Sequence, residues 1–322
     1  MTAVLGVRGL RTHFFTRDGV VKAVDGVDLS LERGKVLGLV GESGSGKSVT
    51  GLSIVGLIDP PGRVVEGSVR LDGRELVGLT PSELQEVRGR QIAMIFQDPM
   101  MSLNPVLRVG TQLSMALRAH DPVDAGEVRR RSIDALGRVG LPSPEQCLDA
   151  YPYQLSGGMR QRVAIAIAIL HRPAVIIADE PTTALDVSIQ GQILQEMQRL
   201  GADTGAALIW ITHDLSVVSS LAHEIAVMYA GRIVEQGLAD DVLSAPRHPY
   251  TRGLLDSVPG DVAPGAPLAQ IPGSIPALID LPPGCAFRAR CARADNACAA
   301  MPEIAACGQG RAVRCVHPLE AA

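Results

Sequence analysis

The stretch Gly41-Glu-Ser-Gly-Ser-Gly-Lys47-Ser48 decides the fold of this chain, because it fits the pattern G-x-x-x-x-G-K-[ST]. The apolar run Val36–Val40 before it predicts a buried strand, and residues 49–57 after it predict a helix. In this strand–loop–helix context the pattern forms a phosphate-binding loop, whereas a flexible linker rich in glycine and serine would not require the flanking elements. The stretch therefore predicts a binding site for a nucleoside triphosphate.

Each part of the phosphate loop has its own chemical role. The glycines let the backbone curl so that its amide N–H groups face phosphate oxygens. We expect Lys47 to reach the β- and γ-phosphates of the nucleotide and the hydroxyl of Ser48 to hold Mg²⁺. The residues expected to bind the nucleotide here are Gly41, Ser43, Gly44, Ser45, Gly46, Lys47, Ser48 and Val49.

The composition is that of a globular protein. Of the 322 residues 46% are hydrophobic and 20% are charged, and the net charge is −4. This balance argues against a basic nucleic-acid-binding surface, so we expect no nucleic-acid partner. Apolar runs such as Val163–Leu170 are far shorter than the roughly 20 residues of a membrane helix. The N-terminal residues also lack the pattern of a signal peptide, so we expect the chain to stay in the cytosol.

The order of expected strands and helices predicts an α/β fold. Residues 4–15 and 20–31 alternate apolar and polar side chains on either side of a turn, which predicts a β-hairpin. The short apolar runs Ala174–Ala178 and Ala207–Ile211 are typical of buried parallel strands, and residues 188–200 between them predict a helix. Strands that alternate with helices predict a parallel sheet covered on both faces.

The composition changes near residue 259. Residues 259–283 contain seven prolines and almost no charge, which predicts an irregular connector. Of the six cysteines, Cys147 stands alone and the other five lie between Cys285 and Cys315. We therefore expect a main domain over residues 1–258 and a Pro-rich connector with a small Cys-rich domain over residues 259–322.

Two carboxylates follow the expected strand Ala174–Ala178. An acidic residue at such a strand end can bind a nucleotide-associated Mg²⁺, and we assign this role to Asp179. The adjacent Glu180 stands where a general base could polarise an attacking water. Surface charge at a strand end is the alternative interpretation, which the phosphate loop upstream disfavours.

The segment Leu155-Ser-Gly-Gly-Met-Arg-Gln161 lies between these two elements. A small hydroxyl and two glycines at a helix start leave exposed N–H groups that suit a γ-phosphate. The segment resembles the LSGGQ signature of ATP-binding cassette (ABC) proteins, with Met159 in place of the glutamine at its fifth position. A Ser-Gly-Gly turn alone is common, but the order phosphate loop, signature and acidic pair is specific.

Further residues match motifs of the ABC family. Gln97 resembles the Q-loop glutamine that senses Mg²⁺ and the γ-phosphate, and Asp186 resembles the D-loop aspartate. His213 resembles the switch histidine that contacts the γ-phosphate. Phe14 or Phe15 resembles the aromatic residue that stacks on adenine, and the spacing to Ala23-Val24 favours Phe14.

The resemblance covers residues 4 to about 245 and includes each expected catalytic motif. It implies an ABC nucleotide-binding domain with a RecA-like core, an antiparallel β subdomain and a helical subdomain over about residues 98–168. Such domains work in pairs, with ATP held between the phosphate loop of one subunit and the signature of the other. Catalysis would depend on Lys47, Gln97, Glu180 and His213, while Ser156, Gly157 and Gly158 would act on the nucleotide of the partner subunit.

Two stretches narrow the resemblance to the oligopeptide/dipeptide importer ATPases, namely Asp98–Pro105 and His248–Leu255. The first stands where a membrane subunit would dock. The resemblance implies a peripheral protein at the cytoplasmic face of the inner membrane that powers import of di- and oligopeptides. Its partners would be a second ABC ATPase subunit, two transmembrane permease subunits and an extracytoplasmic peptide-binding protein.

Other partners and cargoes remain open at this stage. Importers that this chain resembles often contain two different ATPase subunits, so the resemblance favours a heterodimer with a related ATPase over a homodimer. Nickel or another cargo is an alternative, since the cargo is chosen by other subunits. A non-transport ABC ATPase of DNA repair or translation is a further alternative, although the single cassette lacks the inserted coiled coil of repair proteins.

The five C-terminal cysteines have the spacing Cys285-x₅-Cys291-x₆-Cys298-x₈-Cys307-x₇-Cys315. In a protein expected in the cytosol they favour a metal site over disulfides, and no C-x₂-C pair of a zinc ribbon is present. Some importer ATPases bind a [4Fe–4S] cluster at a similar motif. By this similarity the ligands would be Cys285, Cys291, Cys298 and Cys315, with Cys307 spare, and zinc or a metal-free segment is the alternative.

Overall fold

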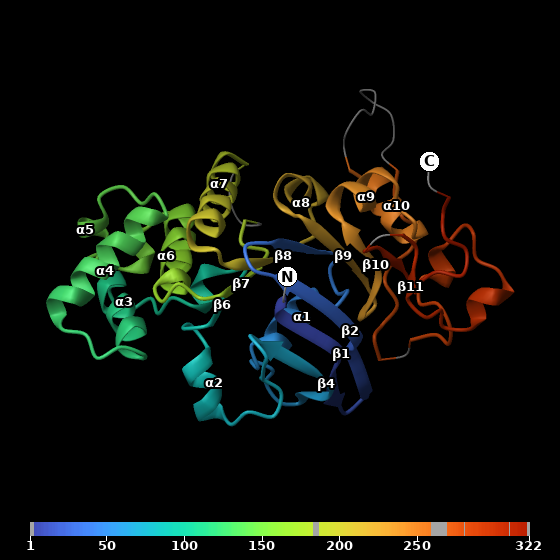
Figure 1. Cartoon of the computed structure of the whole chain (residues 1–322), viewed down its shortest axis with the longest axis horizontal. Coiled ribbons are helices and arrows are strands. Elements are labelled where there is room, and N and C mark those ends of the chain that lie inside the picture. Colours follow the sequence, from blue (N-terminus) through green and yellow to red (C-terminus); the bar gives the residue numbers. More distant parts are fainter. Residues whose placement is uncertain (1–2, 183–186, 259–268, 280, 309, 321–322) are drawn as a thin grey trace. The chain divides into compact units, whose positions relative to one another are not determined.

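The structure, a computed structural model, describes residues 3–182, 187–258, 269–279, 281–308 and 310–320, which Figure 1 draws as a cartoon. The chain forms two compact units. Apart from the first residues of the chain, the first unit contains Glu32–Lys35 and Gly78–Ile209, and the second contains Leu5–Leu31, Val36–Val77 and the residues from Trp210 onward. The domain boundaries that we expected at residues 258 and 259 stay a prediction.

The second unit contains an antiparallel sheet with the strand order β2-β1-β4-β5. Its strands are β1 (Ala3–Thr16), β2 (Gly19–Glu32), β4 (Gly62–Leu71) and β5 (Arg74–Glu75). The predicted hairpin is therefore confirmed. Leu5 lies opposite Leu71 and Val7 opposite Val69, and all four side chains are buried on one face of the sheet.

A second sheet in this unit has the order β11-β12-β10-β9-β3. Its main strands are β3 (Val36–Val40), β9 (Glu224–Tyr229) and β10 (Arg232–Leu238). Strand β3 runs parallel to β9, and β9 runs antiparallel to β10. Helix α1 (Lys47–Ile54) begins two residues before the start expected from the sequence, because Gly46 already caps it in a left-handed conformation with φ 106°.

Four further described elements of this unit precede its C-terminal segment. They are α8 (Leu215–Leu221), α9 (Ala239–Ser244), α10 (Pro249–Asp256) and the residues of β8 (Ala207–Thr212) from Trp210 onward. Helices α8 and α9 and strands β9 and β10 pack around one hydrophobic core that includes Ile225, Tyr229 and Val242. Phe287 of the C-terminal segment lies in the same core.

The described helices and strands of the C-terminal segment are short. They are η3 (Arg288–Arg290), η4 (Asn296–Ala299), β11 (Ala305–Ala306) and β12 (Ala312–Val313). Strand β12 pairs with β10, so Val313 lies opposite Glu235. The segment is therefore attached to the second unit both by this pairing and by the burial of Phe287.

In the first unit, β6 (Ile92–Ile95) and β7 (Val175–Asp179) form a parallel pair; β7 was predicted from the sequence, and β6 was not. All five residues of β7 are buried, as the apolar run predicted. The backbone N–H of Ala207, at the start of β8, donates to the carbonyl of Ala174 at 2.9 Å. Helix α7 (Val187–Thr204) connects β7 to β8, which confirms the predicted strand–helix–strand unit.

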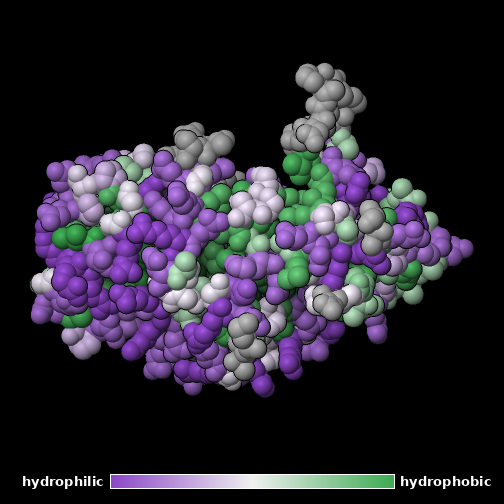
Figure 2. All heavy atoms as spheres, turned by 45° about the horizontal axis from the view of Figure 1, so that its top comes forward, coloured by the Kyte–Doolittle hydropathy of each residue, from purple (hydrophilic) through white to green (hydrophobic). Residues whose placement is uncertain are grey.

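Helices make up the rest of the first unit. They are α2 (Pro81–Val87), η1 (Pro99–Met101), α3 (Val109–Arg118), α4 (Ala125–Arg138), α5 (Pro144–Cys147), η2 (Pro152–Gln154) and α6 (Gly157–Ile169). Helix α4 is amphipathic: Val128 and Leu136 are buried, while Arg130 pairs with Glu127 on the other face. Figure 2 shows hydrophilic residues over most of this helical region, at the left of the view. None of the helices in the described ranges combines the length and the hydrophobicity needed to cross a membrane.

Candidate functional site

The phosphate loop connects β3 to α1 and depends on two glycines. Gly46 has φ 106°, and a Cβ atom there would collide with the carbonyl oxygen of Ala23. A Cβ atom at Gly41 would collide with the carbonyl oxygen of Met228. Because both obstacles are backbone atoms of neighbouring strands, the loop can follow this path only with glycine at these positions.

Lys47 is the first residue of α1, and its side chain is only 4% exposed. Its Nζ atom donates to the carbonyl oxygens of Gly41 and Glu42, at 2.8 Å and 2.9 Å. The ammonium group therefore lies on the concave side of the loop, next to these two carbonyls. This position suits contact with an anion bound in the loop.

The parallel pairing of β6 and β7 brings Gln97 and Glu180 together. Ile95 lies opposite Ala178, so the two strands end side by side. Gln97 Nε2 donates to Glu180 Oε2 at 3.2 Å. Glu180 has φ 44°, a left-handed conformation that is uncommon for a residue other than glycine. Asp179, the last residue of β7, is only 7% exposed.

The signature segment forms the start of α6. Ser156 is the N-cap residue, and its hydroxyl accepts a hydrogen bond from the backbone N–H of Met159 at 3.3 Å. Gly157 is exposed and is the first residue of the helix. The expected arrangement, a small hydroxyl and two glycines at a helix start, is therefore confirmed.

His213 follows β8 directly, and its side chain is exposed. The turn that carries it is held by its neighbours. Asp214 N donates to Thr212 Oγ1 at 3.0 Å, and Asp214 Oδ1 accepts from the backbone N–H of Ser216 at 2.8 Å. Asp214 thereby caps α8, so His213 stands between a strand end and a helix start.

The expected nucleotide-binding residues are divided between the two units. The second unit holds the phosphate loop and His213, and the first unit holds Gln97, Asp179, Glu180 and Ser156–Gly158. Asp186 lies outside the described residues. The structure brings Gln97 to Glu180, and the roles of all these residues toward ATP stay predictions.

The two candidate residues for adenine stacking differ in their surroundings. The ring of Phe14 packs over Gly62, where an added Cβ atom would lie 2.5 Å from Phe14 Cε1. Phe15 is 40% exposed, and the guanidinium of Arg63 lies 4.4 Å from its ring centroid. The choice of Phe14 stays a prediction.

Four cysteines of the C-terminal segment line one pocket. They are the four expected ligands, Cys285, Cys291, Cys298 and Cys315. Cys307 is not among the described residues that line this pocket. All six cysteines are free, and burial raises the pKa of the Cys285 and Cys315 thiols. A bound metal ion would oppose that rise, because the thiolate is the form that binds a metal.

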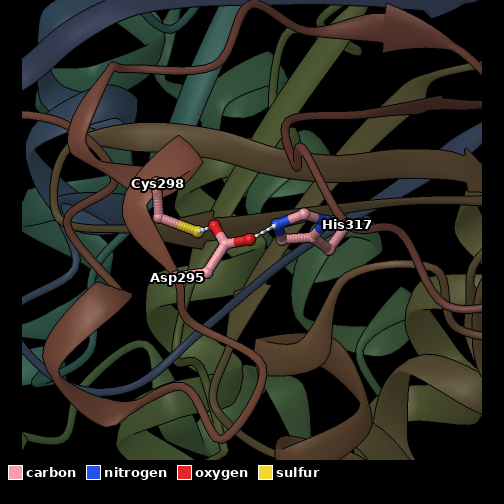
Figure 3. A group of neighbouring side chains, drawn as sticks. All are labelled: Asp295, Cys298 and His317. Atoms are coloured by element: carbon pink, nitrogen blue, oxygen red, sulfur yellow. Dashed lines mark hydrogen bonds and ion pairs between the residues drawn. The ribbon is translucent and has the colours of Figure 1, made fainter.

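Two polar residues missed by the sequence analysis lie near these thiols, and Figure 3 shows both together with Cys298. Asp295 Oδ2 pairs with His317 Nε2 at 2.8 Å, and Asp295 Oδ1 accepts from Cys298 Sγ at 3.8 Å. The backbone N–H of His317 donates to Cys315 Sγ at 3.4 Å. One ligand atom each from Asp295, Cys298 and His317 lie within 4.8 Å of one another. The spacings Asp295-x-x-Cys298 and Cys315-x-His317 were the available signals.

Two family models match the chain. One, described as ABC transporter, matches residues 24–183. The other, described as the C-terminal region of oligopeptide/dipeptide transporters, matches residues 234–298. The second match includes α10 and three of the four cysteines that line the pocket.

The chain is also similar over nearly its whole length to proteins of known function. It is 46% identical to the dipeptide transport ATP-binding protein DppD of Escherichia coli, across 99% of this chain and 98% of that protein. It is 45% identical to the oligopeptide transport ATP-binding protein AppD of Bacillus subtilis, across 98% and 97%.

Solved structures of cassette proteins share the fold. A dimeric bacterial ABC transporter cassette matches with a TM-score of 0.66 and 27% identity, over 73% of this chain and 98% of that chain. The same cassette has been solved in a post-hydrolysis state bound to ADP and phosphate. CbiO1 of Clostridium perfringens matches with a TM-score of 0.64 and 27% identity, over 75% and 91%. These likenesses confirm the α/β fold predicted from the sequence.

Proposed function

We propose that this chain is the ATP-hydrolysing subunit of a peptide importer. The proposal proceeds from the family of the chain, which belongs to the oligopeptide/dipeptide family of ABC transporter ATP-binding proteins. The observation that carries the proposal is the presence of both matches in one chain. Residues 24–183 match the ABC transporter model, and residues 234–298 match the C-terminal region that belongs to oligopeptide/dipeptide transporters. A cassette of DNA repair or translation would have no reason to carry the second region.

Nucleotide binding is the first step of this function. Lys47 would contact the β- and γ-phosphates from inside the curl of the phosphate loop. Ser48 and Asp179 offer a hydroxyl and a carboxylate, which are oxygen donors of the kind that Mg²⁺ prefers. When bound, the ion would neutralise charge on the phosphate oxygens, and Gln97 would be a further contact to the ion.

Hydrolysis would depend on Glu180. Its carboxylate would orient or deprotonate the attacking water, and Gln97, which donates to it at 3.2 Å, would fix its direction. The left-handed backbone at Glu180 is consistent with this role, because strained residues cluster at active sites. His213 would hold the γ-phosphate in the transition state.

The protein would work as a pair of ATPase subunits. Ser156, Gly157 and Gly158 at the exposed start of α6 would complete the nucleotide site of the partner, and Asp186 would contribute across the same interface. We favour a related second ATPase as the partner. Two permease subunits and an extracytoplasmic peptide-binding protein would complete the importer, with this chain bound peripherally at the cytoplasmic face of the inner membrane.

The cysteine-lined pocket would hold a metal group. Four thiols that line one pocket fit the four-thiolate ligand set of a [4Fe–4S] cluster. Such a cluster would supply metal–sulfur bonds that cross-link a segment with few large apolar residues. Asp295 and His317 contact two of the four cysteines and resemble the polar groups that orient metal ligands. Zinc bound by Cys298, His317 and Asp295 is the alternative occupant.

The substitution Glu180→Gln tests the proposed function. It keeps the size of the side chain but removes the base, so we expect ATP turnover to fall by about 10² to 10⁴. ATP binding should persist, and the ATP-bound variant should accumulate as a closed dimer, because hydrolysis is what separates the subunits. ATPase assays, nucleotide-binding titrations and light scattering measure the three effects.

The matched control is Glu86→Gln, which changes an exposed glutamate on α2. It should leave turnover unchanged. Peptide uptake by vesicles that contain the assembled importer should be lost with Glu180→Gln and kept with the control. Near-normal turnover of Glu180→Gln would refute the catalytic assignment, and an active ATPase that never supports peptide uptake would refute the importer assignment.

A further inference from the structure

Every polar group of Glu42, the residue after Gly41 in the phosphate loop, has a partner. Its backbone N–H donates to Tyr250 Oη at 2.8 Å. Its carbonyl oxygen accepts from Lys47 Nζ at 2.9 Å and from the backbone N–H of Ser45 at 3.2 Å. Its carboxylate forms a two-pronged ion pair with Arg290, at 2.7 Å and 3.0 Å. Glu42 is therefore a point at which the C-terminal part of the chain holds the loop.

Arg290 is buried and has other partners that fix its position. Its side chain is only 5% exposed, and its Nε atom donates to the carbonyl of Pro272 at 2.7 Å. The guanidinium lies 5.8 Å from the ring centroid of Tyr229 and 5.9 Å from that of Phe287. Arg290 therefore reaches Glu42 from a defined position rather than as a flexible surface side chain.

The residues around Arg290 form one aromatic cluster. Tyr229 and Tyr250 have ring centroids 4.6 Å apart, and Phe287 lies 5.3 Å from Tyr229 and 5.4 Å from Tyr250. The three rings come from the end of β9, from α10 and from the C-terminal segment. This ring packing, edge-to-face for both pairs that include Tyr229, holds the two groups that contact Glu42, the Tyr250 hydroxyl and the Arg290 guanidinium.

We propose that Arg290 is a positioning residue for ATP binding, which acts on the phosphate loop through Glu42. The two carbonyls that receive Lys47 belong to Gly41 and Glu42, so the backbone at residue 42 sets where the ammonium lies. Arg290 also neutralises a carboxylate that would otherwise repel the polyphosphate that the loop binds. The C-terminal segment would thus act on the nucleotide site indirectly, through the contact between Arg290 and Glu42.

The test is a titration of the full-length chain with a fluorescent ATP analogue in the presence of Mg²⁺. Arg290→Met leaves the carboxylate of Glu42 unpaired, and we expect the dissociation constant to rise about ten-fold. The control, Arg252→Met, changes an exposed arginine on α10 and should bind as the wild type does. Thermal melting and metal analysis of each variant separate a local effect from unfolding.

A double substitution separates positioning from a general loss of stability. Glu42→Gln removes the repulsive charge, so adding it to Arg290→Met should bring the dissociation constant back toward that of the wild type. A merely structural role for Arg290 predicts no such recovery. Tyr250→Phe deletes only the hydroxyl that accepts from Glu42 N–H, and should weaken binding about five-fold even if Arg290→Met does not fold.

The inference rests on the proposed binding of ATP, and the outcomes distinguish the two. A wild-type chain that fails to bind the analogue would overturn the proposed function itself. Wild-type affinity in folded Arg290→Met, or in Tyr250→Phe, would overturn only the positioning role. A double variant as weak as Arg290→Met alone would also contradict it.

Discussion

The phosphate loop and the C-terminal segment from Cys285 to His317 are both irregular, yet they differ in how closely backbone atoms crowd them. Six residues of the loop, Gly41–Gly46, lie between β3 and α1, and neighbouring backbone crowds the loop at Gly41 and Gly46. The C-terminal segment has described strands of only two residues, and it is held by the pairing of β12 with β10 and by side chains such as Phe287 and Arg290. Close backbone packing leaves no room for an added atom at Gly41 or Gly46, whereas the C-terminal segment depends more on a few individual side-chain partners.

A pair of glycine substitutions tests this difference between the two regions and has the largest expected effect. Gly46→Ala adds a Cβ atom that collides with the carbonyl of Ala23, whereas Gly310→Ala adds one in open space, and both residues have positive φ. Strain at such a φ costs about 1–3 kcal/mol, and overpacking adds about 1–3 kcal/mol. If both costs fall on the loop, ATP affinity should drop by about 10² to 10⁴ with Gly46→Ala, measured by titration. Equal affinity in the two variants would show that the loop is less constrained than its packing indicates.

Cysteine substitutions examine the other region. Cys298→Ser removes one of the thiols that line the pocket, and Cys307→Ser is the matched control outside that lining. Loss of a partner of a metal ligand costs about 10–100-fold in affinity, so loss of a ligand should cost at least as much. We expect anaerobically purified Cys298→Ser to lose iron and sulfide, and the control to keep them. Equal metal content in both variants would contradict the assigned ligand set, and zinc without sulfide would identify the alternative occupant.

These two regions also differ in how far the sequence predicted them. The β1–β2 hairpin, β7, β8 and the phosphate loop follow from local alternation, apolar runs and one motif, because neighbours in the sequence determine them. The contact between Gln97 and Glu180 was not derivable from spacing, since it depends on the register of two parallel strands. The pair Glu42–Arg290 joins residues 248 positions apart. No local pattern signals such a pair, because tertiary packing alone decides which arginine meets which carboxylate.

Lowering the pH should have a smaller effect, which is a loss of folding stability that depends on His248. This residue caps α10, where its Nδ1 atom accepts a hydrogen bond from Tyr250 N at 3.0 Å, so the ring must stay neutral at that nitrogen. Burial lowers the pKa of His248 from 6.5 to about 4. Between these two values the unfolded state binds more protons than the folded state, so stability rises with pH across this window and is unaffected by His248 above it.

The variant His248→Asn should flatten this dependence, since asparagine can cap the helix without titrating. At pH 5 protonation of the unfolded state should cost the wild type about 2 kcal/mol of unfolding free energy relative to pH 7. The variant should lack this loss, although it will be less stable throughout because the histidine ring is fully buried. Urea unfolding at pH 5 and pH 7 measures both slopes. Parallel curves would mean that His248 does not control the acid response, and that α10 keeps Tyr250 beside the phosphate loop by packing rather than by its cap.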